Sequence, residues 1–379
     1  MNDFKDGVPV CLVCLRSLDA PSTQVARSTR RKNTALSLPY PEQQMPLKRV
    51  PCLGKEQGCR DSFCPTRCRK SAQKQFHWMC CVGRVKASQR TAYFKFVQYD
   101  WVQSGVDYSD TAMLGLRIVA QVFCAHRLRR ASLEEAFEPY AQLICSPITS
   151  FFFTYLLTGG MPTGSSSSAA TAEHAAAFVT CKHGPLSIPA VRAAYVQRTR
   201  DKDTFCLTTL DLLHNAFDMN PEERSFVHAR RWSELMGAVL LNGQERSPPS
   251  PYEVHREHVD SLTDGRRAMR AFEAEVFQTS SVKDVSNLLC NSRGQGIYRV
   301  GCLFNHSCEP NLNAQYSAVN DETLTVVALR DVKAGEELTI RYIDASFPLA
   351  VRQQQLLEHY LFECRCTRCV AQRRGDACG

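Results

Sequence analysis

Apolar residues recur at helical spacing in the first half of the chain. Leu114, Ile118, Val122 and Ala125 follow one another at intervals of four, four and three residues, so they share one face of a helix. We therefore predict that residues 91–290 form a mainly helical region.

Residues that favour helix ends divide this region. Ser132, with Glu135 three positions later, predicts a capping box at the start of one helix. Asn220-Pro221-Glu222-Glu223 predicts the start of another helix, which should end at Asn242-Gly243. Between them, residues 159–177 are rich in Gly, Ser and Ala and are expected to be a low-complexity excursion.

The pattern changes to strands after Gly296. Thr323–Leu329 alternates apolar and polar residues, Lys333-Ala334-Gly335 predicts a turn, and Glu337–Ile343 predicts a returning strand. Leu349–Phe362 is expected to be a last helix.

Two segments are rich in residues that break regular structure. Pro21–Pro51 is a polar stretch of Ser, Arg, Gln and Pro, and we expect a flexible loop or linker there. Ser247–Pro251 predicts a second break, ahead of a short helix over Arg266–Phe277.

Cysteine usage indicates the compartment. The 379 residues include 19 cysteines, many of them in short pairs, and no charged segment followed by an apolar one marks a secretory route. Paired cysteines in such a chain are more typical of metal ligands than of disulfide bonds. The longest apolar run, Ile148–Leu157, is too short to cross a bilayer. We therefore expect a protein of the cytoplasm or the nucleus that does not enter membranes.

Positive charge is concentrated near the N-terminus. Residues 1–100 carry 18 Lys and Arg against 7 Asp and Glu, whereas the remainder carries 28 against 31. A basic module can bind an acidic partner or nucleic acid. No recognition helix or aromatic platform accompanies this basic segment, so direct binding of nucleic acid is not expected.

Residues 11–81 contain eight soft ligands. Eight ligands are enough for two closed tetrahedral zinc sites, one with four cysteines and one with three cysteines and a histidine. Thiolates suit structural zinc because they bind it tightly without redox chemistry. The candidate ligands are Cys11, Cys14, Cys52, Cys59, Cys64, Cys68, His77 and Cys81.

The order of these ligands resembles the MYND zinc finger, including Phe63 before Cys64. Six residues separate Cys52 from Cys59 where the family usually has two, and Cys80 competes with Cys81 for the last position. The resemblance implies that the pairs interleave. The implied groups are Cys11, Cys14, Cys64 and Cys68 for one ion and Cys52, Cys59, His77 and Cys81 for the other.

Three further motifs follow one another between Gly301 and Cys369. They are Asn305-His306-Ser307-Cys308 with Glu309-Pro310-Asn311, then Glu336–Tyr342, then Cys364-x-Cys366-x-x-Cys369. In this order they resemble the two halves of the cofactor-binding knot of SET-domain methyltransferases and the post-SET zinc motif. By that resemblance the last motif takes its fourth ligand from Cys308, which gives three zinc ions per chain.

The zinc and knot motifs together resemble the SET-and-MYND-domain lysine methyltransferases. The chain ends ten residues after Cys369, without a long helical-repeat tail, so it is most similar to the divergent fifth subfamily. The resemblance implies an α+β fold with a β-rich SET core. The implied parts are a MYND module over 11–81 with an inserted loop over 21–51, a helical insert over 91–290, the SET core over 291–345, and a post-SET segment over 346–379.

The family transfers the methyl group of S-adenosylmethionine to a lysine of a histone or another protein. The resemblance implies that Tyr342 directs its hydroxyl at the methyl group and that Tyr360 lines the channel for the target lysine. Such a site must mainly align the two reactants at about 3–3.5 Å and exclude water.

The resemblance also implies a set of cofactor-binding residues. Asn305 and His306 would hold the adenine end through backbone and side-chain hydrogen bonds, beside Phe304, and Phe362 would stack on the adenine. For a further cofactor asparagine, Asn242 fits the pattern of the fifth subfamily and Asn291 fits that of the other members. We favour Asn242.

A rival interpretation is a non-catalytic adaptor, whose MYND module docks a proline-containing peptide beside a degenerate SET core. Binding of S-adenosylmethionine distinguishes it from an enzyme. Family members also begin with a strand-rich segment that covers the cofactor, which Met1–Val10 cannot supply. We therefore expect either a chain that starts too late or an incomplete cofactor pocket, and favour the first.

Overall fold

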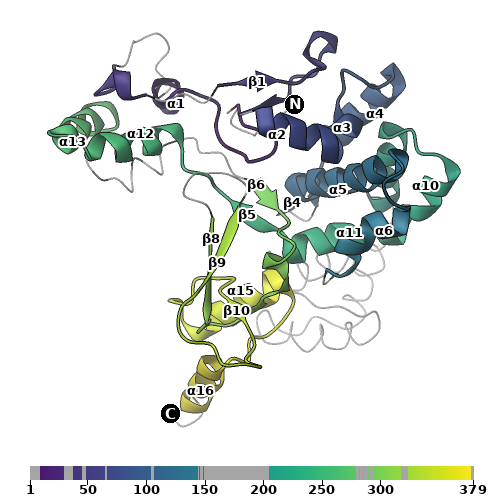
Figure 1. Ribbon diagram of the computed structural model, residues 1–379. Coiled ribbons are helices and arrows are strands. Elements are labelled where there is room, and N and C mark those ends of the chain that lie inside the picture. The colour runs from purple at the N-terminus through teal and green to yellow at the C-terminus, as the bar shows by residue number, and fades with distance from the viewer. Residues whose placement is uncertain are drawn as a thin grey trace. The chain divides into compact units, whose positions relative to one another are not determined.

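A computed structural model of the chain describes residues 9–29, 37–44, 48–64, 66–103, 106–143, 205–278, 294–316 and 323–376, with single residues 145, 148, 281, 285 and 289. Helices and short strands are mixed along it, and they belong to two compact units (Figure 1). Unit 1 comprises Met1–Arg84, Glu245–Gly294 and Tyr316–Thr323. Unit 2 comprises Val85–Gln244, Gln295–Gln315 and Leu324–Gly379.

The cysteine-rich part of unit 1 is built from very short elements. β1 (Val50–Pro51) pairs antiparallel with β2 (Ser62–Phe63). The other elements are η2 (Lys55–Gln57), α2 (Thr66–Ala72), η3 (Gln73–His77) and α3 (Trp78–Cys80). α2, η3 and α3 follow one another without a break over 66–80, and the interior of this part combines the buried cysteines with a few apolar side chains such as Phe63 and Met79.

A second part of unit 1 has an apolar core of its own. α1 (Pro21–Ser28) contacts α12 (Pro251–Asp260), and α12 contacts α13 (Gly265–Val276), as Figure 1 shows. The buried side chains of this core are Val25, Leu38, Tyr252, Val259, Met269, Phe272, Val276, Val285 and Leu289.

The prediction of a flexible loop over 21–51 is wrong for the residues described there. α1 and η1 (Pro41–Gln43) form within it, and Val25 and Leu38 are almost fully buried. The Gln24 side chain also accepts a hydrogen bond from the backbone N–H of Tyr252, 3.0 Å away. The segment is polar on average, but the apolar side chains of Val25 and Leu38 and the amide of Gln24 hold it against the rest of this core.

The break predicted at Ser247–Pro251 is also the start of α12. Ser250 and Glu253 form a reciprocal capping box, and Pro251 occupies the first turn, where its missing N–H costs no hydrogen bond. The helix predicted over Arg266–Phe277 is confirmed as α13.

Unit 2 contains most of the predicted helical region. Its first elements are α4 (Ala87–Val97), β3 (Val102–Gln103), β4 (Val106–Asp107), α5 (Ser109–Arg127) and α6 (Leu133–Ala141). α5 buries Ile118 and Val122 of the predicted face. Ser132 and Glu135 form the predicted capping box, with the Ser132 hydroxyl accepting from the Glu135 N–H at 3.2 Å. The excursion at 159–177 lies outside the described residues.

One predicted helix is two helices. α10 (Pro221–Phe226) starts at the predicted capping box of Asn220 and Glu223, but it ends at Phe226. α11 (Ala229–Asn242) then begins after His228, whose ring nitrogen accepts a hydrogen bond from the N–H of Arg231. Histidine is not among the favoured N-cap residues, so the usual start signals do not reveal this break. The end at Asn242 is confirmed.

The strands of unit 2 pair in twos. β7 (Asn305–His306) pairs parallel with β10 (Thr339–Ile340), and β8 (Leu312–Tyr316) pairs with β9 (Leu324–Ala328). β9 confirms the strand predicted at Thr323–Leu329, and Gly335 has a φ of +82° in the predicted turn. A strand does return after the turn, but it is shorter than predicted and its partner is β7.

The remaining elements complete the chain. β5 (Gln244–Arg246) and β6 (Gly294–Gly296) lie where the chain passes from one unit to the other, and η4 (Gly301–Leu303) precedes β7. α15 (Leu349–Tyr360) confirms the predicted last helix, and α16 (Thr367–Asp376) follows it. Within the described residues, each sheet has two strands, and no helix is long and apolar enough to span a membrane.

Candidate methyltransferase site and zinc groups

The first cysteine group lies in unit 1 and joins a turn to the segment from β2 to α2. Cys11 and Cys14 sit in a turn closed by the Cys11 N–H, which donates to the Arg16 carbonyl at 2.8 Å. Cys64 follows β2 and Cys68 lies on α2. All four thiols are buried, and their sulfur atoms lie within 4.8 Å of one another. The structure thus brings together the four residues that the MYND resemblance groups.

The second group, Cys52, Cys59, His77 and Cys81, also gathers within 4.8 Å. The longer spacing between Cys52 and Cys59 is taken up by η2 and by Gly58, whose φ of +96° turns the chain back. The Cys52 Sγ lies 3.0 Å from His77 Nε2 and accepts a hydrogen bond from the Gly54 N–H at 3.2 Å. Cys81 belongs to the group, whereas Cys80 is buried outside it.

The third group lies in unit 2 and joins three elements. Cys308 follows β7, Cys364 and Cys366 follow α15, and Cys369 lies on α16. The Cys308 and Cys369 sulfur atoms are 3.6 Å apart. Burial is the largest influence on the Cys308 thiol and raises its pKa to about 11.

The donor chemistry of the three groups fits zinc. Each offers four sulfur or imidazole donors within 4.8 Å, which matches a closed tetrahedral structural site. Thiols packed this closely cannot all ionise without a cation between them, because the thiolates repel one another. A zinc ion in each group would remove that repulsion.

The two halves of the predicted knot meet as a parallel strand pair. Asn305 lies opposite Thr339 and His306 opposite Ile340, and the Ser307 N–H donates to the Ile340 carbonyl at 3.1 Å. Asn311 bridges the residues around this pair, although the sequence singled it out only as part of the knot motif. Its amide donates to the Glu337 carbonyl at 2.8 Å and its carbonyl oxygen accepts from the Thr339 N–H at 2.9 Å.

Four rings gather beside the third cysteine group. Tyr342 lies at their centre, with ring centroids 4.7 Å from Tyr360, 5.4 Å from His306 and 6.5 Å from Phe362. All four side chains are half-buried and pack against or beside the group that holds Cys308. The structure therefore brings both predicted catalytic tyrosines and the predicted stacking residue into one aromatic cluster, which we call the tyrosine centre.

The Tyr342 hydroxyl is held in place. It donates to the Phe304 carbonyl at 2.6 Å, so its oxygen lone pairs remain to accept a hydrogen bond. Burial raises the pKa of Tyr342 to about 12 and also raises the pKa of Tyr360. At neutral pH both side chains are therefore uncharged phenols that can orient a substrate but cannot act as strong bases.

His306 is engaged within the protein through both ring nitrogens. The Tyr342 N–H donates to Nδ1 at 3.1 Å, which places the proton of the neutral ring on Nε2, 3.5 Å from the Cys308 sulfur. Burial, with the charges of Arg341 and Arg352, lowers the pKa of His306 to about 4. The expected side-chain hydrogen bond to an adenine would require His306 to give up one of these contacts.

The other predicted cofactor residues lie around the same strand. Asn305 is exposed on β7, and its amide donates to Glu337 at 2.7 Å. Asn242 is buried at the end of α11, and its backbone carbonyl accepts from the Cys302 thiol at 3.3 Å. Cys302 is two residues from Phe304, so Asn242 lies close to the knot in space. Asn291 lies outside the described residues.

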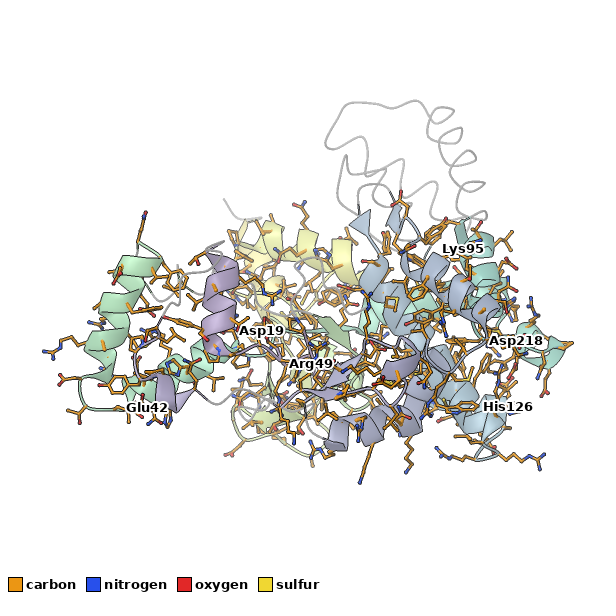
Figure 2. All side chains as sticks on the ribbon, turned by 90° about the horizontal axis from the view of Figure 1, so that it is seen from above. Asp19, Glu42, Arg49, Lys95, His126 and Asp218 are labelled. Atoms are coloured by element: carbon orange, nitrogen blue, oxygen red, sulfur yellow. The ribbon has the colours of Figure 1, made fainter. Side chains whose placement is uncertain are left out.

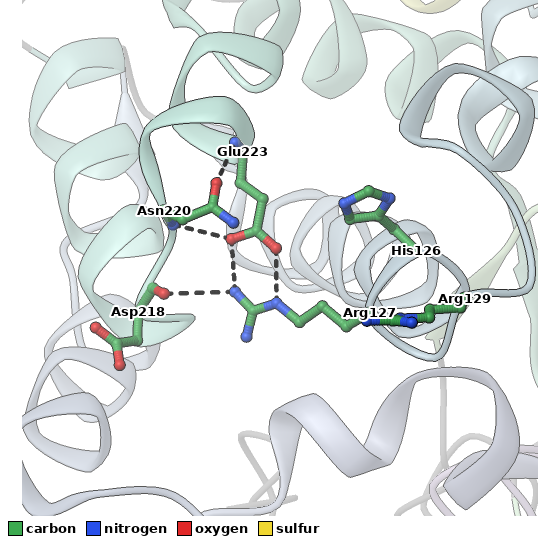
Figure 3. A pocket seen from close by; sticks show the side chains of 6 residues that line it. All are labelled: His126, Arg127, Arg129, Asp218, Asn220 and Glu223. Carbon is green, nitrogen blue, oxygen red and sulfur yellow. Dashed lines mark hydrogen bonds and ion pairs between the residues drawn. The ribbon is translucent and has the colours of Figure 1, made fainter.

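A separate pocket of about 390 Å³ opens at the end of α5 (Figure 3). Arg127 donates to the Glu223 carboxylate at 2.6 and 2.7 Å and to the Phe217 carbonyl at 2.9 Å. His126 and Asp218, both labelled in Figure 2, line opposite sides of it in Figure 3, and Asp218 pairs with Lys86. Since these charges are largely paired within the protein, we interpret the Arg127–Glu223 pair as a structural contact between α5 and α10.

Comparison with known proteins extends this picture. Residues 195–343 match the SET domain family. The match begins upstream of the 291–345 span expected for the SET core.

Three relatives illustrate the range of similarity. A SET and MYND domain-containing protein of Dictyostelium discoideum is 55% identical over 82 residues, 21% of this chain and 15% of its own length. The histone-lysine N-methyltransferase SMYD3 of Mus musculus is 29% identical over 169 residues, 36% of this chain and 39% of its own length. The protein-lysine N-trimethyltransferase SMYD5 of Gallus gallus is 25% identical over 372 residues, 96% of this chain and 75% of its own length. The chain therefore spans less than half the length of the first two relatives and most of the third.

Proposed function

From the premise that the chain contains a SET domain and is related to the SET and MYND domain-containing proteins, we propose that it is a protein-lysine methyltransferase that uses S-adenosylmethionine. The observation that carries the proposal is the tyrosine centre. It joins Tyr342, Tyr360 and Phe362 to the paired strands β7 and β10, beside a buried cysteine group.

The residues of the tyrosine centre fit this cofactor. S-adenosylmethionine, when bound, supplies a methyl group on a sulfonium that an uncharged amine can attack. Aromatic faces attract cations and stack on planar bases, and both Tyr342 and Phe362 are half-buried rather than sealed in a core. We assign Phe362 to the adenine, and Asn305, Asn242, Phe304 and the backbone of His306 to the edge of the cofactor pocket.

Tyr342 is assigned to the reacting centre. Because its hydroxyl already donates to the Phe304 carbonyl, it can only accept a further hydrogen bond, which suits the N–H of an incoming lysine amine. The Tyr360 ring, 4.7 Å from Tyr342, forms a second wall of the lysine channel. Rate enhancement would come from alignment and from exclusion of water, without a strong general base.

The remaining structure would support this centre. We propose that β7, β8, β9 and β10 belong to a β-rich SET core and that the three cysteine groups each hold a structural zinc ion. The substrate is a lysine on a protein, either a histone or another protein. The printed names of SMYD3 and SMYD5 cover both classes.

The test is methyl transfer by the full chain. S-adenosylmethionine with a labelled methyl group is incubated with the protein and fractionated cell extract, and the labelled residue is identified by mass spectrometry. The proposal expects label on the side-chain nitrogen of lysine, and label on other residues alone would contradict it.

Calorimetry with S-adenosylmethionine separates the enzyme from the rival adaptor. An enzyme binds the cofactor with saturation. If the folded protein with its zinc showed no binding, and a proline-containing peptide bound unit 1 instead, the adaptor would replace the enzyme as the function.

A further inference from the structure

Arg352 is a buried cation on α15, beside the third cysteine group. Its side chain has no exposed surface, which is rare for arginine. It donates to the Phe347 carbonyl and to the Gln372 amide oxygen on α16, and its guanidinium also donates to the Cys369 sulfur at 3.7 Å. Arg352 therefore links the start of α15, the body of α16 and a predicted zinc ligand.

The guanidinium has no carboxylate partner among the described residues. Its neighbours that could carry a negative charge there are the thiol groups of Cys369 and Cys308, and it donates a hydrogen bond to the Cys369 sulfur. Hydrogen bonds to neutral oxygens offset only part of the cost of taking a cation out of water at this depth, and a nearby negative charge is needed to offset the rest. The thiols alone, when protonated, supply no such charge.

The third group with a zinc ion bound would supply the negative charge that the Arg352 guanidinium lacks. A zinc ion bound by four thiolates carries a net negative charge, because four thiolates outweigh one divalent ion. That buried anion and the buried guanidinium then stabilise each other. Groups just outside the ligands commonly tune a metal site in this way.

We infer that Arg352 is the countercharge of the zinc-loaded third group and thereby positions the tyrosine centre. Arg352 and Tyr360 lie on the same helix, about two turns apart, so the contact that holds Arg352 against Cys369 also fixes the helix that carries Tyr360. The inference requires zinc in the third group, but it does not require methyl transfer.

The experiment measures zinc retention in each group of the full chain. The protein is titrated with a zinc chelator and treated with a thiol-alkylating reagent, and the cysteine peptides are quantified by mass spectrometry. Peptides with Cys364, Cys366 and Cys369 report the third group, whereas those with Cys11, Cys14, Cys64 and Cys68 serve as an internal reference. Zinc analysis of the unaltered protein comes first, because its absence from the third group would contradict both the zinc proposal and this inference.

Two variants separate charge from packing. Arg352→Met keeps much of the side-chain volume without the charge, and it should weaken zinc binding in the third group by about 10–100-fold. Arg352→Lys keeps the charge and should restore most of that loss. If Arg352→Met retained zinc as well as Arg352→Lys did, Arg352 would be a packing residue and the inference would be wrong.

Two control variants test whether loss of any arginine on α16, or of one hydrogen bond to Arg352, is enough to release zinc. Arg373→Met removes an exposed arginine from α16, and Gln372→Ala removes a hydrogen-bond partner of Arg352 but keeps its charge. Both should leave zinc retention within about threefold of the unaltered protein, since neither removes a buried charge. If Arg352→Met cannot be purified, Arg352→Gln takes its place against Arg352→Lys. An equal loss of zinc from the reference group in unit 1 would contradict a local role for Arg352.

Discussion

The second and third cysteine groups use similar ligands in different surroundings. The second group includes His77, and the Gly54 N–H donates to the Cys52 sulfur. The third group has four cysteines, with a buried guanidinium against Cys369 and the His306 ring of the tyrosine centre beside Cys308. Similar donor sets therefore lie in the interior of a small module in unit 1 and beside a candidate active site in unit 2.

This difference follows from what surrounds each group. In unit 1, β1, β2 and η2 are two or three residues long, so the ligands themselves hold the chain together. In unit 2, Cys308 follows directly on β7 and Cys364 follows on α15. Loss of the third group should therefore displace the tyrosine centre, whereas loss of a unit 1 group should disturb unit 1.

Cys308→Ser should produce the largest effect. Serine is a poor zinc ligand, so the third group should lose its ion, and methyl transfer should fall below detection as the β7 knot separates from α15. Elemental analysis and the labelled-methyl assay check both results. Cys145→Ser, which removes an exposed cysteine outside the three groups, is the matched control and should change neither.

Tyr342→Phe should lower methyl transfer by about 100-fold, since it deletes one hydroxyl placed at the reacting centre. Zinc content and thermal stability should remain close to those of the unaltered protein. Steady-state kinetics with the labelled cofactor measure the change. A variant that altered only the apparent affinity for substrate, at unchanged turnover, would show that Tyr342 does not act at the reacting centre.

Tyr360→Phe should have a smaller effect. Its hydroxyl lies 3.5 Å from the Tyr342 carbonyl, a long hydrogen bond, while its ring supplies the wall of the proposed channel and remains in the variant. We expect a loss of about 2–10-fold in turnover, consistent with one modest hydrogen bond. A loss as large as that of Tyr342→Phe would give Tyr360 an equal part in the chemistry.

Cys14→Ser should have the smallest effect on methyl transfer. It removes a ligand of the first group and should lower the zinc content by one ion per chain, with partial unfolding of unit 1 seen by hydrogen exchange. Transfer to a small peptide substrate should change by less than about threefold, because the tyrosine centre is built wholly from unit 2. Complete loss of transfer would remove the distinction between the groups.

The sequence predicted the ligand groups better than it predicted their surroundings. Short spacings and residue type marked the cysteines as candidate ligands, and the resemblance to the MYND finger and the post-SET motif assigned them to groups, which the structure brings together despite the long interval between Cys52 and Cys59. The fully buried Arg352 gave no such signal, because arginine is usually exposed and the sequence alone does not reveal its burial.

Features set by neighbouring residues were predicted, whereas features set by residues far along the chain were not. The capping boxes at Ser132 and Asn220 were predicted because cap and partner lie three residues apart. The docking of α1 was not predicted, since Val25 meets its apolar neighbours more than two hundred residues later in the chain. The alternating pattern alone suggested that β10 returns against the strand before it, whereas it pairs in parallel with β7, and only the resemblance to the SET-domain knot related these two distant segments.

The most direct test of the link between zinc and the tyrosine centre is to follow methyl transfer while zinc is withdrawn from the full chain. Transfer is assayed at each chelator concentration, and alkylation of the cysteine peptides reports which groups have lost their ion. We predict that transfer falls in step with exposure of Cys364, Cys366 and Cys369, and that it does not follow exposure of the unit 1 cysteines. Transfer that persisted after the third group was fully alkylated would contradict the account.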